Sequence, residues 1–498
     1  MTGERLTYTF GPLERRGILG PLRAPQVAAL AGAVAAAIAA IDRSPSATSA
    51  LAAVIVIALA LAAAFAPLAG ATLLDWIPLS VAFWGRRAAR RGRERSPVAT
   101  AGMLAGAIRR AGLIPRDPTA RPPRPLHGVR LAAADYGERP IGVLSERSGR
   151  RVTAVLACRV GAFSLLDADA QERRLARWGL VLSGAAGTAV RRIQWIERTA
   201  PAQGDQLARW LHDERDPAVP LRGTPMIESY LELISSSARV TQEHEILLAV
   251  QVDARGVRDR GAGGVTGALV EEVERVAQGL EAAEVTVLGA LSPGQLARTL
   301  RTAYDPYARA ELTALEAADP ERDGLREVNA WPQGTREAWD HYQSDGALHA
   351  TYWIGGWPRI DVSAMFMDAL LGRSGAVRTV AVSFEALAPA RSTREIEAAV
   401  TRDRADRELR ARFGQSETAR QRQAADATMR REAELASGHA EVRLSGFITV
   451  SGRDRDDLRR GASEVLEHAA RARLELHRLY GQQADAFTFT LPLCRGLR

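Results

Sequence analysis

The sequence predicts a transmembrane α-helical hairpin at the N-terminus, followed by an α/β (α+β) cytoplasmic domain of two lobes with a projecting helical hairpin. Two long apolar segments stand near the N-terminus, an arginine-rich run follows the second, and the remaining chain alternates apolar runs with amphipathic stretches. The expected divisions are a cytoplasmic N-terminal segment at 1–24, the membrane hairpin at 25–84, a basic and proline-rich linker at 85–126, a first lobe at 127–305, and a second lobe at 306–498 with the helical hairpin at 391–437.

The two apolar segments are expected to cross a membrane together. No charged residue occurs from Pro25 to Ile41 or from Ser44 to Leu74. The second segment has about the 20 apolar residues needed to cross a hydrocarbon core of about 30 Å. The first is shorter and alanine-rich, and it becomes a plausible partner because small residues let helices approach closely. A cleaved signal peptide is disfavoured, since no cleavage site follows the first segment and a second comes directly after it. The remaining alternative is a buried, alanine-rich helical pair in a soluble protein.

Arginines flank these segments unequally. Four precede the first segment, six lie in residues 86–95 (RRAARRGRER), and only Arg43 lies in the connecting loop. The positive-inside rule therefore predicts a multi-pass protein of the cell membrane, with both termini cytoplasmic and the loop around 42–49 outside. An indole prefers the headgroup level, and the arginine run lies on the cytoplasmic side of the second segment. The predicted membrane-interface residues are therefore Trp76, Arg86, Arg87, Arg90, Arg91, Arg93 and Arg95.

The composition excludes several classes of function. All 66 basic side chains are arginine, so neither a Walker-type phosphate loop nor a Schiff-base lysine is present. The abundance of alanine and arginine is typical of a GC-rich, actinobacterial genome. The net charge of +8 is concentrated in residues 86–95, which alone contribute +5, so it does not favour direct nucleic-acid binding by the large domain. Two cysteines are too few for a metal cluster or a disulfide framework and indicate a reducing compartment.

The two lobes are expected to follow the same order of strand, helix and strand, which suggests a pseudo-repeat although no sequence repeat is visible. In the first lobe we expect strands at 128–134, 141–146, 151–160, 190–198, 245–254 and 284–290, and helices at 167–182, 204–214, 225–238, 265–283 and 293–303. In the second we expect strands at 348–357, 377–387, 440–452 and 485–493, and helices at 361–371, 454–479 and, broken at Gly414, 391–437.

One glycine-rich stretch is a weak candidate for a phosphate-binding loop, formed by Gly261, Gly263, Gly264 and Gly267. Such a loop would place backbone N–H groups and a helix N-terminus against a phosphate. Its spacing departs from the dinucleotide fingerprint, because Thr266 stands where a glycine is expected, and it does not lie in a first βαβ unit. The alternative is a simple flexible loop before a helix.

No catalytic or metal-binding constellation is evident. His244 and His439 each stand beside glutamates but do not have a metal-ligand spacing, and Cys494 has no nearby histidine to activate it. No nucleophile-elbow motif occurs. We therefore expect a protein that is not an enzyme and has neither a cofactor nor a metal.

Several stretches resemble known secretion proteins. The hairpin with its arginine run is similar to the PrgI-type membrane components of conjugative and type IV secretion systems. The body resembles the non-motor N-terminal domain of conjugative secretion ATPases. The residues that carry this resemblance are Tyr352–Trp353, Trp357–Pro358, Phe366, Leu370, Leu371, the helical excursion 391–437, GHAEVRLSGFITVSG at 438–452, Gly481-Gln482-Gln483, Ala486-Phe487 and Leu491-Pro492. The whole looks most like an actinobacterial membrane family in which the two modules are fused, and the EccE-type component of type VII secretion is a close alternative by architecture.

The resemblance implies a non-enzymatic integral membrane scaffold of a conjugative or type IV-like secretion apparatus. Its expected partners are membrane lipids, a separate secretion or conjugation ATPase, and other apparatus proteins in an oligomeric complex. ATP hydrolysis does not carry over, because the Walker lysine is absent. Two alternatives stay open: an EccE-like membrane component of type VII secretion, and a membrane-tethered regulator that binds nucleotide or DNA.

Overall fold

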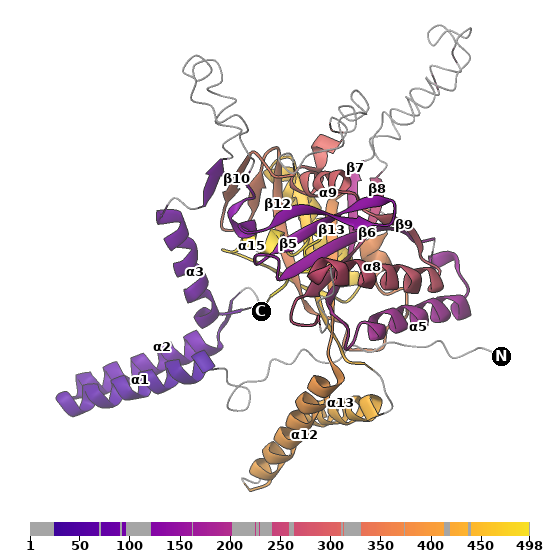
Figure 1. Cartoon of the computed structure of the whole chain (residues 1–498). Coiled ribbons are helices and arrows are strands. Elements are labelled where there is room, and N and C mark those ends of the chain that lie inside the picture. The colour runs from indigo at the N-terminus through magenta and orange to yellow at the C-terminus, as the bar shows by residue number, and fades with distance from the viewer. Residues whose placement is uncertain are drawn as a thin grey trace, which may run out of the picture. The chain divides into compact units, whose positions relative to one another are not determined.

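The computed structural model divides the chain into two compact units, of which the larger holds a sheet domain at 92–392 and 437–498 and the other spans 10–91 and 393–436 (Figure 1). The structure describes residues 24–68, 71–89, 92–95, 121–161, 163–201, 225, 229, 242–257, 263–309, 312, 330–372, 374–412, 419–436 and 440–497.

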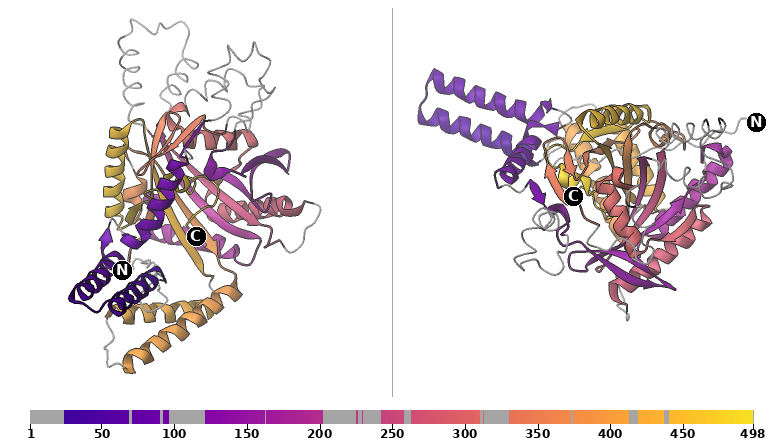
Figure 2. Two further views of the ribbon diagram at one scale, coloured as in Figure 1. Left: turned by 90° about the vertical axis from the view of Figure 1, so that its left-hand side faces the viewer. Right: turned by 90° about the horizontal axis from the view of Figure 1, so that it is seen from above.

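The predicted N-terminal helical pair is confirmed. Helix α1 (Ala24–Arg43) and helix α2 (Ala47–Phe65) lie side by side (Figure 2). The loop between them ends at Ser46, whose hydroxyl accepts a hydrogen bond of 3.2 Å from the Ser49 N–H and so caps α2. The strands β1 (Pro67–Leu68) and β2 (Ala71–Thr72) form a small antiparallel ladder, and helix α3 (Leu73–Ala88) follows.

The larger unit is built on one antiparallel sheet. Its order is β3-β10-β11-β12-β14-β13-β7-β8-β6-β5-β4, with β15 added beside β12 and β9 beside β6. The strands are β3 (Arg93–Arg95), β4 (Arg130–Tyr136), β5 (Arg139–Glu146), β6 (Arg151–Arg159), β7 (Val190–Pro201), β8 (Gln242–Asp253), β9 (Thr286–Ala290), β10 (Gly334–Glu337), β11 (Tyr342–Ser344), β12 (Ala347–Gly356), β13 (Val377–Ala386), β14 (Val442–Gly452) and β15 (Glu475–Arg478).

The expected pseudo-repeat is visible in the topology. In the first half, β6, α5 (Ala168–Gly184), β7, β8, α8 (Gly264–Ala282) and β9 form a split βαβ unit with strand order β9-β6-β8-β7. In the second half, β12, α11 (Asp368–Leu371), β13, β14, α14 (Arg455–Arg471) and β15 repeat this order as β15-β12-β14-β13. The equivalent strands β7 and β13 pair antiparallel, so the two predicted lobes share one continuous sheet about a pseudo-two-fold axis.

Alternation along the strands separates two cores. On β8, Leu248 and Val250 face one core, which is covered by α8, whereas Leu247 and Ala249 face the other. Trp195 of β7 packs against both the α8 core and the α14 core, so these two helices cover the same face. The opposite face is covered by α9 (Pro293–Tyr304), α15 (Gln483–Phe487) and the C-terminal segment.

The C-terminal segment is not the predicted strand at 485–493. Residues 483–487 form α15, and turns follow. The hydroxyls of Thr488 and Thr490 donate to carbonyl oxygens three residues earlier, and the side-chain amide of Gln194 donates to the Phe489 carbonyl at 2.8 Å. These backbone groups are therefore satisfied without a neighbouring strand, although the apolar alternation is typical of one.

The remaining differences concern helix lengths and the short strands β3, β10, β11 and β15, which the sequence did not predict. The helix predicted at 454–479 ends at Arg471, because Arg473 adopts a left-handed conformation (φ 58°) before β15 begins. The helix predicted at 361–371 is reduced to the single turn of α11. The projecting helices are present as α12 (Pro389–Arg412) and α13 (Ala419–Ala436), while Gly414 and most of the predicted helices 204–214 and 225–238 lie outside the described residues.

Candidate membrane-attachment site

Helices α1 and α2 contact each other through small side chains. Ala33, Ala37, Ala53 and Ala64 are buried in the hairpin unit. The side-chain amide of Gln26 donates a 2.7 Å hydrogen bond to the carbonyl oxygen of Ala64, in the last turn of α2. Carbonyls in a last turn have no partner within their own helix, and such groups must be satisfied inside a membrane. The pair is therefore closed by alanine contacts and one interhelical hydrogen bond.

The large apolar side chains of the hairpin point outward. The exposed fractions lie between 40% and 64% for Val34, Ile38, Ile41, Leu51, Val54, Ile55, Val56, Leu59, Leu61 and Phe65. Both helices are long and apolar enough to cross a membrane, with mean hydropathies of 1.6 and 2.5. A buried helical pair in a soluble protein would turn these side chains inward. The observed arrangement favours lipid as the surroundings, and it supports a membrane protein.

The predicted orientation can be tested by cysteine labelling. The two native cysteines are buried, so a cysteine introduced at a single site is the main target of a maleimide. In intact cells, Ser46→Cys is expected to react with a membrane-impermeant maleimide, whereas Glu138→Cys, in the exposed β4–β5 turn, reacts only after lysis. Labelling of Glu138→Cys in intact cells, with no labelling of Ser46→Cys, would show that the orientation in the membrane is the reverse of the predicted one.

The predicted interface residues fall in two different structural elements. Trp76, Arg86 and Arg87 belong to α3, with the two arginines in its last turn. Arg93 and Arg95 belong to β3, which pairs with β10 at one end of the sheet. Arg90 and Arg91 lie outside the described residues. The arginine run therefore contributes to a helix terminus and to a sheet edge, and does not form one helical patch.

The glycine stretch opens helix α8, as the sequence suggests. Gly263 is the residue before the helix, Gly264 has a left-handed conformation (φ 56°), and Gly267 lies in the first turns. A Cβ at Gly263 would stand 2.9 Å from the Cα of Gly267, so the tight start of the helix explains Gly263, and the left-handed backbone explains Gly264. Gly261 lies outside the described residues, and phosphate binding here stays a prediction.

His349, the more deeply buried of two buried histidines among the described residues of the sheet domain, is held by hydrogen-bonding distances to neighbouring elements. The Nε2 of His349 lies 3.0 Å from the carbonyl oxygen of Tyr304, and its Nδ1 lies 2.9 Å from the Ser451 hydroxyl. Complete burial lowers the pKa of His349 to about 4, so the ring is neutral at pH 7. It joins β12, β14 and the end of α9.

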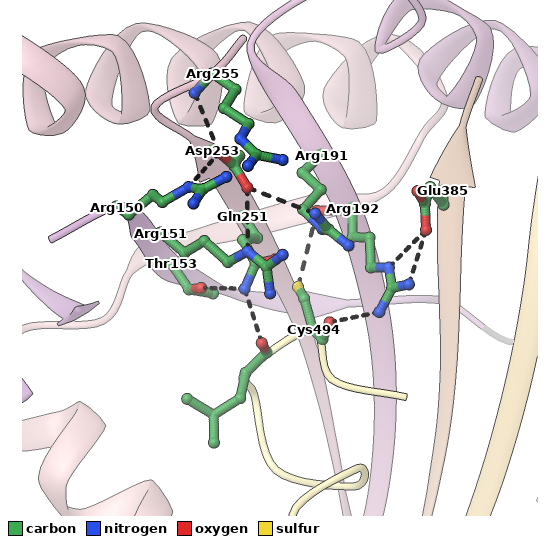
Figure 3. A network of polar contacts seen from close by, with 11 residues as sticks. Arg150, Arg151, Thr153, Arg191, Arg192, Gln251, Asp253, Arg255, Glu385 and Cys494 are labelled. Carbon is green, nitrogen blue, oxygen red and sulfur yellow. Dashed lines mark hydrogen bonds and ion pairs between the residues drawn. The ribbon is translucent and has the colours of Figure 1, made fainter. Parts of the chain in front are cut away.

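An arginine cluster that the sequence analysis did not identify surrounds the end of β8 (Figure 3). The Asp253 carboxylate accepts hydrogen bonds from Arg151 Nε at 3.1 Å and from Arg191 Nη1 at 3.5 Å, and Arg150 Nε lies 3.7 Å away. Burial and the neighbouring guanidinium groups of Arg151 and Arg192 lower the pKa of Arg191. The tandem arginines at 150–151 and 191–192, each at a strand start, are the sequence signal for this site.

Gln251 and Arg192 attach the C-terminal segment to the same end of the sheet (Figure 3). The Gln251 amide donates to the Thr153 hydroxyl at 3.2 Å and to the Leu493 carbonyl at 2.9 Å. Arg192 donates two hydrogen bonds, of 2.9 and 2.8 Å, to Glu385 and one of 3.2 Å to the Cys494 carbonyl. The cluster thus stabilises strands from both halves, and its excess of guanidinium groups makes this end of the sheet basic.

One part of the chain matches a known protein family. Residues 240–354 match the family described as the putative type VII ESX secretion system translocon, EccE. This stretch runs from β8 through α8 and α9 to β12, across the junction of the two halves. No curated protein matches the chain significantly. The match supports the EccE alternative and lends no support to the PrgI-type resemblance. With the two apolar helices, it supports a membrane component of a secretion system.

Proposed function

We propose that this protein is an EccE-like, non-enzymatic membrane component of a type VII secretion translocon. The observation that carries the proposal is the match of residues 240–354 to EccE in a chain that begins with a lipid-facing helical pair. In this function α1 and α2 anchor the chain with both termini in the cytoplasm, and the sheet domain is the part that meets other translocon proteins.

The cysteines and the polar networks of the sheet domain have structural environments. Burial raises the pKa of the Cys158 thiol to about 11 and raises that of Cys494 further, so both thiols are protonated and unreactive at neutral pH. No group of three or more histidine, cysteine, aspartate or glutamate side chains suited to a metal occurs among the described residues. The polar networks at Asp253 and His349 join strands to one another.

A separate ATPase is the partner that this function requires. The chain has no lysine, so it cannot contribute a Walker-type phosphate loop, and energy for transport would come from another polypeptide. The basic end of the sheet at Arg150, Arg151 and Arg191 is a surface that an acidic segment of a partner could contact.

The experiment is co-purification of the full chain, expressed with its neighbouring genes and extracted in mild detergents. We expect a large particle that contains type VII components and a lysine-bearing ATPase. A tagged two-helix membrane protein of unrelated function serves as the control for non-specific recovery. If the chain is recovered together with a conjugation ATPase, the result would contradict this proposal and support the type IV-like alternative. A monodisperse particle without apparatus proteins, in several detergents, would contradict both.

A further inference from the structure

Helix α3 has an exposed stripe of large apolar side chains. Leu73, Ile77, Val81 and Trp84 have exposed fractions of 40%, 55%, 68% and 60%. Their spacings of four, four and three residues place them on one face of the helix. Phe83, on another face, is only 5% exposed, so the helix already has a buried side. A helix that is apolar both toward its own protein and away from it requires a further apolar environment.

The start of α3 separates it from the membrane-crossing helix. The Asp75 carboxylate accepts hydrogen bonds from the Thr72 backbone N–H at 3.1 Å and from the Thr72 hydroxyl at 2.9 Å. These contacts fix the first turn of a new helix. Between α2 and α3 the β1–β2 ladder reverses the chain, and α3 turns away from the direction of α2 (Figure 1). Helix α3 is therefore not a continuation of the second membrane span.

The charged residues of α3 are placed for a membrane surface. Arg86 and Arg87 lie in its last turn, and the Arg87 guanidinium stands 5.7 Å from the centre of the Trp84 ring. Tryptophan prefers the headgroup level, and each arginine near an anionic leaflet strengthens binding about fivefold. The neighbouring sequence is equally basic, since residues 86–95 hold six arginines and one glutamate.

We propose that α3 is a membrane-surface helix that binds anionic lipid. The stripe Leu73, Ile77, Val81 and Trp84 lies among the acyl chains of the leaflet that α2 leaves, and Arg86 and Arg87 contact lipid phosphates. The covalent continuity with the membrane hairpin and the charge complementarity select lipid as the occupant of this face. The proposal does not depend on which secretion apparatus contains the protein.

Site-directed spin labelling of the full chain in nanodiscs tests this arrangement. Nitroxides are attached to Ile77→Cys, Val81→Cys and Trp84→Cys, and to Leu79→Cys on the other, less exposed side of the helix as the control. Leu73→Cys replaces any stripe variant that fails to fold. We expect the stripe labels to collide with oxygen more than with a water-soluble nickel chelate, and to report one common depth. The Leu79 label is expected to show no such preference.

The other outcomes overturn the proposal. A helix that crosses the bilayer would change the label depth by about 10 Å between positions 77 and 84, at 1.5 Å per residue. Stripe labels that collide mainly with the nickel chelate would place this face in water. Stripe labels shielded from both reagents would mean that protein covers it.

Lipid charge is tested in nanodiscs of phosphatidylglycerol with phosphatidylcholine, compared with phosphatidylcholine alone. We expect the Val81 label to lie deeper in the anionic bilayer, and the Arg86→Gln/Arg87→Gln variant to lose this difference. Arg43→Gln, at the C-terminal end of α1, is the matched control and is expected to retain it. An unchanged dependence on lipid charge in the double variant would contradict the assigned role of the two arginines.

Discussion

Replacement of Asp253 by asparagine is expected to lower the free energy of unfolding by about 2–4 kcal/mol. The substitution keeps the shape of the side chain but removes the carboxylate between Arg150, Arg151 and Arg191. The Asp253 side chain is only 9% exposed, so water replaces little of the lost interaction. The expected loss in the free energy of unfolding is smaller than for a fully buried ion pair, because the three arginine side chains are 17–35% exposed and partly hydrated.

The measurement is denaturant or thermal unfolding of the detergent-solubilised protein at fixed pH and salt. Glu284→Gln is the matched control, because Glu284 also pairs with two arginines, Arg174 and Arg177, but lies in an exposed position. We expect no appreciable shift of its unfolding midpoint. An Asp253→Asn protein that unfolds with the wild-type midpoint would show that the arginine cluster does not hold the strands together.

Replacement of Glu197 by glutamine is expected to cost about 3 kcal/mol or more, because it leaves the charge of Arg378 buried and unpaired. The Arg378 side chain has no exposed surface, and its nearest carboxylate is that of Glu197, at 3.7 Å. Burial already lowers the pKa of Arg378, while the charges of Glu197 and, to a smaller extent, Glu464 raise it, so Glu197 is the main carboxylate that makes the buried cation tolerable. Glu197 also lies 2.6 Å from His244 Nδ1, a contact that glutamine can keep.

A double-mutant cycle separates this charge effect from a loss of packing. Arg378→Met removes the buried cation, and the Glu197 carboxylate that it leaves keeps His244 Nδ1 as a partner at 2.6 Å, so this variant is expected to cost less than Glu197→Gln. In the combined variant neither charge stays unpaired, and most of the loss caused by Glu197→Gln should be recovered. Unfolding midpoints of the four proteins provide the measurement. Strictly additive effects would show that the two side chains are not coupled.

Much of the sheet was predictable because its signals are local. Strands such as β6, β8 and β13 are continuous apolar runs rich in β-branched residues, and their predicted positions differ from the observed ones by only a few residues. The helix predicted at 265–283 coincides with α8 for the same reason, since its apolar residues recur with helical spacing. The expected order of strand, helix and strand in each lobe also indicated the pseudo-repeat.

Helix α3 and the structure of the segment 485–493 were not predicted, for different reasons. Helix α3 carries a local signal, the pair Thr72 and Asp75, but its apolar residues follow the membrane segment and resemble its tail. The segment 485–493 has the apolar alternation of a strand, yet side chains from distant strands, including Gln194, satisfy its backbone groups. Only the packed structure shows which of these competing partners the backbone takes.

The sequence by itself determined the pair of long apolar helices near the N-terminus, the absence of a lysine-bearing phosphate loop from these residues and the order of most strands, because hydropathy, composition and periodicity act within a short window. The tertiary structure decided which strands meet, including the central pairing of β7 with β13, and it placed Arg378 and Asp253 among their charged neighbours. These contacts join residues that are about 60 or more positions apart, and no local pattern specifies such a partner.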